Sequence, residues 1–251
     1  MIPVSVCIIT KNEAAHLENC LAALQPFPFE VVVVDTGSSD HSKDVARQFT
    51  DKVFDYTWTD DFSAARNYAA SCASHNIIFP IDTDEIITSL DWDALQSMLA
   101  SHPKSVGYIR RLDYFEVNSE IRHYDVMIER IYDRRYYHYE RPIHEVILPL
   151  SNTAHTSYET SITIDHIGYL GGQEALQSKA ERNLALLKAE VDKEPDDPYP
   201  YFQIGQSYML MRNHQQACEY FKEALLRNPP PAESYTRVLV NNYGNALIDT
   251  D

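Results

Sequence analysis

The residues best suited to chemistry are two aspartates, Asp82 and Asp84, which directly follow an apolar run at residues 77–81. At the end of a buried strand, both carboxylates can approach one hard divalent cation. Proteins hold Mg²⁺ or Mn²⁺ at nucleotide sites with one or two carboxylates together with the substrate phosphates. Such a cation acts as a Lewis acid and stabilises a departing diphosphate. Acidic turns are common, so this interpretation depends on what surrounds the pair.

The surrounding segments are strands that alternate with helices. Apolar runs predict strands at residues 4–9, 30–34, 53–56 and 77–81, and helical spacing predicts helices at 14–24, 43–49 and 63–74. This alternation predicts an α/β fold with an open, mostly parallel sheet. Ligands bind to such sheets at the carboxyl ends of the strands. Polar clusters at residues 10–13, 35–40 and 82–85 follow three of these strands, so we expect the site at that edge.

The second half of the chain has two different patterns. Residues 107–147 are rich in aromatic and β-branched side chains, which fits either an acceptor pocket or an ordinary half-buried sheet. From residue 173 the pattern is helical, and a tetratricopeptide template fits residues 198–231. The matching positions are Tyr201, Ile204, Gly205, Tyr208, Ala217, Phe221, Ala224 and Pro229.

These patterns predict an α/β domain at residues 1–172 and an all-α tetratricopeptide-like segment at residues 173–251. Roughly one and a half repeats cannot bury their apolar faces alone. The helical segment should therefore contact the α/β domain or a protein partner.

Composition excludes some classes of ligand. The 251 residues include 37 acidic and 21 basic side chains, a formal net charge of -16. This charge repels nucleic acid and anionic membrane surfaces, so a substrate that carries phosphate needs a cation or local basic groups. No run is long and apolar enough to span a membrane, and no signal peptide is evident, so we expect a cytoplasmic protein. Four scattered cysteines, without metal-ligand spacing, are expected to be reduced and structural.

Four segments together resemble the successive motifs of family 2 glycosyltransferases, which have the GT-A fold. They are residues 6–13, 33–40, 62–67 and 81–85, in the same order and spacing as in that family, and the resemblance covers about residues 2–172. The chain is most similar to bacterial members that append tetratricopeptide repeats, a group similar to peptide S-glycosyltransferases. The resemblance implies inverting, hexosyltransferase-type transfer from a nucleotide sugar, most simply a UDP-sugar, with Mn²⁺ or Mg²⁺ as cofactor. The acceptor is left open: a peptide, a protein or a glycan.

The resemblance also implies roles for individual residues. Those assigned to the nucleotide sugar are Thr10, Asn12 and Glu13 in the pocket, Asp35 beside the uracil ring, Arg66 near the ribose or diphosphate, and Asp82 facing the ribose and the water shell of the metal. Asp84 is expected to bind the metal, with His166 as a further ligand. Plainer interpretations stay open: Glu13 as a helix-terminal charge, Arg66 as an ion-pair partner and His166 as a satisfied core histidine.

The catalytic base is expected to be Glu145, in the segment Pro142-Ile143-His144-Glu145, which the resemblance places at the site. The family's usual Glu-Asp pair is not evident in this chain. Glu116, Asp125 and Glu129 therefore remain competing candidates. Two other functions remain open: a non-catalytic adaptor that binds partners through its helices, and a nucleotidyltransferase, although the latter usually has a glycine-rich basic loop where this chain has residues 10–13.

Overall fold

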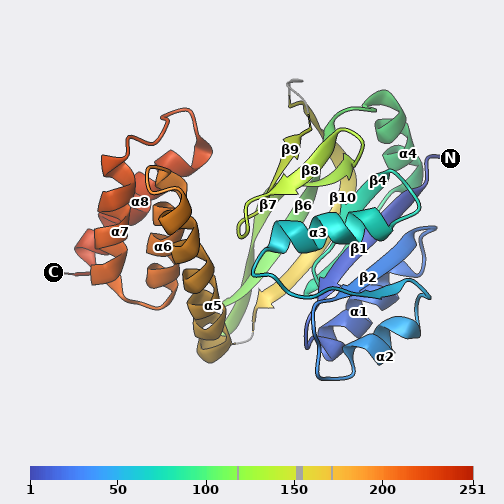
Figure 1. Ribbon diagram of the computed structural model, residues 1–251, viewed down its shortest axis with the longest axis horizontal. Coiled ribbons are helices and arrows are strands. Elements are labelled where there is room, and N and C mark those ends of the chain that lie inside the picture. The colour runs from blue at the N-terminus through green and yellow to red at the C-terminus, as the bar shows by residue number, and fades with distance from the viewer. Residues whose placement is uncertain (118, 151–154, 171, 251) are drawn as a thin grey trace. The chain divides into compact units, whose positions relative to one another are not determined.

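The computed structural model describes residues 1–117, 119–150, 155–170 and 172–250 (Figure 1). The chain divides into two compact units, Met1–Leu170 and Gly171–Asp251. None of the described helices is long and apolar enough to cross a bilayer. The cysteines Cys7, Cys20, Cys72 and Cys218 are free, as expected from their spacing.

The first unit is built on an eight-stranded sheet with the order β3-β2-β1-β4-β7-β6-β10-β5. These strands are β1 (Val4–Thr10), β2 (Glu30–Asp35), β3 (Val53–Asp55), β4 (Ile77–Pro80), β5 (Glu85–Leu90), β6 (Val106–Val117), β7 (Glu120–Asp133) and β10 (Ser157–Tyr169). Strands β1 to β4 pair in parallel, and β10 pairs in parallel with β6. The other neighbours, β4 with β7, β6 with β7 and β5 with β10, are antiparallel. The predicted α/β class with a mostly parallel sheet is confirmed.

Two apolar layers cover the two faces of this sheet. The helices of the unit are α1 (Ala14–Leu24), α2 (Ser42–Arg47), α3 (Phe62–Cys72) and α4 (Trp92–Ser101), and a separate hairpin consists of β8 (Tyr137–Glu140) and β9 (Val146–Pro149). One core cluster contains the buried residues of α1, α2 and α4, and the other contains those of α3, β8 and β9. Figure 1 shows α3 and the hairpin in front of the same face of the sheet.

Strand β1 explains why both faces are covered. Val6 and Ile8 belong to one core cluster and Cys7 to the other, because successive side chains of a strand point to opposite faces. A strand buried on both faces needs a continuous apolar run rather than alternation. One boundary differs from expectation: Glu85, predicted to end a polar loop, is the first residue of β5 and is fully buried.

The second unit contains α5 (Gly172–Lys193), α6 (Pro198–Leu210), α7 (His214–Leu226) and α8 (Ser234–Ile248). Asp197 and Asn213 accept backbone hydrogen bonds at the starts of α6 and α7. A Cβ atom on Gly205 would lie 2.4 Å from the ring of Phe221, which is fully buried. Glycine at this template position therefore lets α6 and α7 pack closely.

Candidate active site

The carboxyl ends of β1 and β2 bring Thr10 and Asp35 side by side, because these residues are register partners. Asp35 Oδ1 accepts hydrogen bonds from the backbone N–H groups of Gly37 and Ser38, each at 2.9 Å. Gly37 adopts φ +108, a conformation that L side chains rarely take. Asp35 Oδ2 and Thr10 Oγ1 are buried and have no hydrogen-bond partner among the described residues. Buried polar atoms of this kind require an explanation, and a ligand would supply one.

Asn12 and Glu13, in the loop after β1, make contacts with neighbouring loop and helix residues. Asn12 has φ 57, and its Oδ1 accepts the backbone N–H of Ser39 at 2.7 Å, so it joins the loop after β1 to the loop after β2. Glu13 precedes α1, makes no side-chain cap hydrogen bond and pairs with His16 at 2.9 Å on the exposed surface. In this structure Asn12 shapes the loop, and Glu13 has the helix-terminal position that the plainer interpretation describes.

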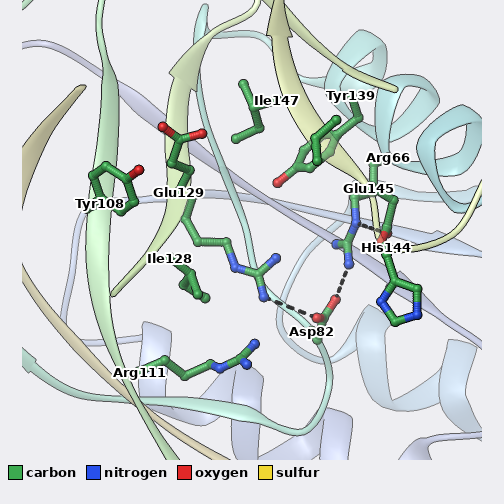
Figure 2. Close-up of a pocket in the computed structure, with 12 residues that line it drawn as sticks. Arg66, Asp82, Tyr108, Arg111, Ile128, Glu129, Tyr139, His144, Glu145 and Ile147 are labelled. Carbon is green, nitrogen blue, oxygen red and sulfur yellow. Dashed lines mark hydrogen bonds and ion pairs between the residues drawn. The ribbon is translucent and has the colours of Figure 1, made fainter. Parts of the chain in front are cut away.

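A cavity of about 440 Å³ lies beside Asp82, which is one of its lining residues (Figure 2). Its lining comes from α3, the β4–β5 turn, β6, β7 and the β8–β9 hairpin, and consists of Arg66, Asp82, Tyr108, Arg111, Ile128, Glu129, Arg130, Tyr139, His144, Glu145, Val146 and Ile147. Of the predicted site residues, Arg66, Asp82 and Glu145 line this cavity, whereas Thr10, Asn12, Glu13 and Asp35 do not.

Arg66 joins two carboxylates of the cavity lining, those of Asp82 and Glu145 (Figure 2). Its Nε donates to Glu145 Oε1 at 2.7 Å, and its Nη2 donates to Asp82 Oδ1 at 2.8 Å. Arg130 donates to the other oxygen of Asp82 at 3.3 Å. Burial alone would raise the pKa of Asp82, but the charges of Arg66 and Arg130 outweigh it and hold that pKa well below its usual range. Asp82 is therefore an anion at neutral pH.

Asp84 faces His166 instead of the cavity cluster. His166 Nε2 lies 3.4 Å from Asp84 Oδ2, and His166 Nδ1 lies 2.5 Å from Oδ1 of the buried Asp113. Burial would lower the pKa of His166, but the two carboxylates outweigh it and raise that pKa to about 9. A Cβ atom on Gly168 would lie 2.2 Å from Asp84 Oδ2 and 2.7 Å from His166 Nε2. Glycine at position 168 therefore lets the backbone pass close to this pair.

The pair has the features of a partial cation site. Carboxylate oxygen and imidazole nitrogen bind divalent cations at about 2.0–2.2 Å, which brings neighbouring ligands to about 3 Å from each other. Metal-binding histidines usually donate their second ring N–H to a carboxylate, and Asp113 occupies that place. Among the described residues no group of three or more His, Cys, Asp or Glu side chains is arranged to hold a metal alone. Asp84 and His166 fit a cation that takes its remaining ligands from a substrate.

The structure also sorts the competing acidic residues. Glu129 lines the cavity and contacts His155 at 2.7 Å. Asp125 pairs with the exposed Arg110, and Glu116 is exposed on β6, and neither lines the cavity. Glu145 and Glu129 are the two glutamates that face this space.

The sequence analysis assigned no role to four charged residues of the site: Glu85, Asp113 and Arg130, which are buried, and Arg111, which is half-buried. All four lie on strands of the antiparallel half of the sheet. The only signal in the sequence is that charges recur in runs that otherwise fit buried strands, as in Gly107–Asp113. A charged residue in such a run is equally typical of a strand with one face in solvent, so the pattern does not indicate burial.

The chain belongs to glycosyl transferase family 2, whose family model matches residues 5–155. It is therefore a family 2 glycosyltransferase, as the sequence motifs predicted. The chain is 30% identical over 246 residues to a TPR repeat-containing protein of Synechococcus elongatus, covering 94% of this chain and 60% of that protein. It is 24% identical to the SPbeta prophage-derived glycosyltransferase SunS of Bacillus subtilis, covering 89% of this chain and 53% of SunS.

The chain thus spans a little over half the length of these relatives. Among solved structures, TarS of S. aureus matches 98% of this chain and 55% of its own, with a TM-score of 0.49 and 14% identity.

Proposed function

We propose that this chain transfers a sugar, with inversion, from a UDP-sugar to an acceptor hydroxyl or thiol, and that Asp84 and His166 would hold a divalent cation that assists departure of the diphosphate. The observation that carries the proposal is the approach of His166 Nε2 to Asp84 Oδ2 at 3.4 Å, two residues along the chain from Asp82 of the Asp82–Arg66–Glu145 cluster. Family membership supports sugar transfer. The donor, the cation and the stereochemistry rest on the arguments that follow.

The unpartnered atoms at the ends of β1 and β2 favour uracil. An ionised Asp35 carboxylate accepts hydrogen bonds through Oδ2 but cannot donate one, whereas Thr10 Oγ1 can donate one. A ring N–H beside a carbonyl satisfies both atoms. Uracil has this arrangement at N3, and cytosine lacks the ring N–H. Leaving either buried atom unpaired is costly, so the two atoms discriminate between bases.

The cation would be held by Asp84 and His166 Nε2, with Asp82 near its water shell. It would supply Lewis-acid stabilisation of the leaving diphosphate. Mg²⁺ and Mn²⁺ at nucleotide sites normally keep few protein ligands and take the rest from phosphates and water. A two-residue site therefore predicts that the cation binds the UDP-bound protein more tightly than the free protein. By the same coupling, UDP should bind the cation-bound protein more tightly than the free protein.

Glu145 is positioned to serve as the base. Arg66 fixes its Oε1, and the side chain lines the cavity in which an acceptor would lie. Glu145 takes the proton from the acceptor O–H or S–H, and the acceptor atom forms a bond to the anomeric carbon. The bond from that carbon to the diphosphate oxygen breaks, and its electron pair leaves with the UDP. Attack from the face opposite the leaving group inverts the configuration.

The test is a titration of UDP with and without Mn²⁺. The wild-type protein should bind UDP more tightly with Mn²⁺, and Asp84→Asn should remove that gain while leaving the protein folded. Asp44→Asn is the matched control, because Asp44 is exposed in α2 and contacts only neighbouring side chains there. A wild-type chain that binds no UDP in either condition would favour the adaptor function instead. The cytoplasmic location and a protein partner for the helical unit stay predictions.

A further inference from the structure

An unbroken series of buried and half-buried opposite charges connects the candidate base to the candidate cation pair. Acidic and basic side chains alternate along it, in the order Glu145, Arg66, Asp82, Arg130, Glu85, Arg111, Asp113, His166 and Asp84. We call this series the charge chain. Its two ends belong to the proposed chemistry. Its middle has no role in that chemistry.

Glu85 is the middle residue of the charge chain. Its Oε1 accepts from Arg130 at 2.7 Å and from Arg111 at 3.4 Å. Its Oε2 accepts the backbone N–H of Asp82 at 3.0 Å. Glu85 is fully buried and does not line the cavity, so it cannot touch a substrate there.

Each contact of Glu85 leads to one side of the cation pair. On one side, Glu85 fixes the Asp82 backbone directly and the Asp82 carboxylate through Arg130, and Asp84 is two residues further along the same turn. On the other side, Arg111 donates from Nη1 to Glu85 and from Nη2 to Asp113 at 3.0 Å. Asp113 in turn fixes the ring of His166. The turn that bears Asp84 and the strand that bears His166 thus meet at one carboxylate.

We propose that Glu85 is a positioning residue for the cation pair, acting through Arg111 and Asp113 on His166 and through Asp82 on the turn of Asp84. Without its charge, Arg111 and Arg130 lie close together with no shared anion between them. Like charges in a buried setting move apart or draw in other partners. The positions of Asp84 and His166 are then no longer fixed relative to each other, although neither residue has been changed.

This inference rests on the proposed function, and the test measures cation binding rather than turnover. Mn²⁺ affinity is measured by the electron paramagnetic resonance signal of free Mn²⁺ at saturating UDP, UDP affinity is measured without metal, and melting temperature is recorded for each variant. Glu85→Gln keeps the shape and removes the charge. Arg111→Lys keeps the charge, but one ammonium group cannot hold both carboxylates as the planar guanidinium does. The second variant carries the test if the first fails to fold.

The expected result is a loss of Mn²⁺ affinity of about 10- to 100-fold in both variants, the usual effect of removing a partner of a metal ligand. UDP affinity without metal should fall by much less than Mn²⁺ affinity, because Thr10 and Asp35 lie on other strands. The matched control is Ile87→Ala, which removes a core side chain two residues along the same strand. It should lower the melting temperature and leave Mn²⁺ affinity unchanged.

Mn²⁺ affinity within twofold of wild type in both Glu85→Gln and Arg111→Lys overturns the inference. So does an equal loss of affinity in Ile87→Ala, because Glu85 would then act only through general stability. A wild-type protein that binds UDP but no Mn²⁺ overturns the proposed cation site itself. That outcome is distinct from failure of the variants alone.

Discussion

Replacing Gly168 with alanine tests the cation pair without removing either ligand. The added Cβ would lie 2.2 Å from Asp84 Oδ2, whereas ordinary van der Waals contact begins at 3.4 Å, so the carboxylate would have to retreat by about 1.2 Å. The backbone of Gly168 is outside the left-handed region, so alanine adds no backbone strain there. Metal–ligand distances tolerate deviations of only about 0.2 Å. We therefore expect Mn²⁺ affinity in the presence of UDP to fall by at least about tenfold.

The assay is isothermal titration of Mn²⁺ into the UDP-saturated protein, with thermal unfolding as the check on the fold. Gly244→Ala is the matched control, because a Cβ on Gly244 in α8 meets nothing within 4 Å. It should leave Mn²⁺ affinity unchanged. If Gly168→Ala binds Mn²⁺ as tightly as the wild type, Asp84 and His166 do not share a cation.

Three other perturbations have clear expected outcomes. Because the pKa of His166 is raised from 6.5 to about 9, its charged form stabilises the metal-free protein by roughly 3 kcal/mol below pH 6.5, and this stabilisation is lost as pH rises through 9. Urea unfolding should therefore give a lower free energy of unfolding at pH 9.5 than at pH 6, and His166→Gln should remove this His166 contribution. If His166→Gln leaves the difference between the two pH values unchanged, the assignment is contradicted. Asp35→Asn should weaken UDP binding by about tenfold and reduce its preference over CDP in titrations, whereas an unaltered preference would remove Asp35 from base recognition. Phe221→Ala should destabilise the helical unit by about 3–5 kcal/mol in circular-dichroism melts, and a loss under 1 kcal/mol would mean that α6 and α7 do not depend on this ring.

The parallel half of the sheet could be predicted because its signals are local. Each strand from β1 to β4 is a short apolar run, and each functional residue stands directly at its end, as Thr10, Asp35 and Asp82 do. The helices between them follow their own periodicity. Sequence neighbours are also spatial neighbours here, so motif order and site geometry carry the same information.

The antiparallel half could not be predicted in the same way, because its contacts join residues far apart in sequence. Asp113 meets His166 across 53 residues, and Glu85 meets Arg130 across 45. Which face of β6 and β7 these charges occupy depends on strand register, and a shift of one residue would reverse it. No local pattern fixes that register. The charge chain is consequently visible only in the folded molecule.

The charge chain also explains why an acidic glycosyltransferase would need a cation for its donor. Three buried or half-buried guanidinium groups, those of Arg66, Arg111 and Arg130, belong to this charge chain. Each of them already contacts two carboxylates, so little positive charge remains to attract phosphate. The arginines therefore organise the carboxylates and do not replace a metal. The proposed divalent cation beside Asp84 would supply the charge that they cannot, and this predicts that UDP binds the metal-free protein mainly through its base and ribose.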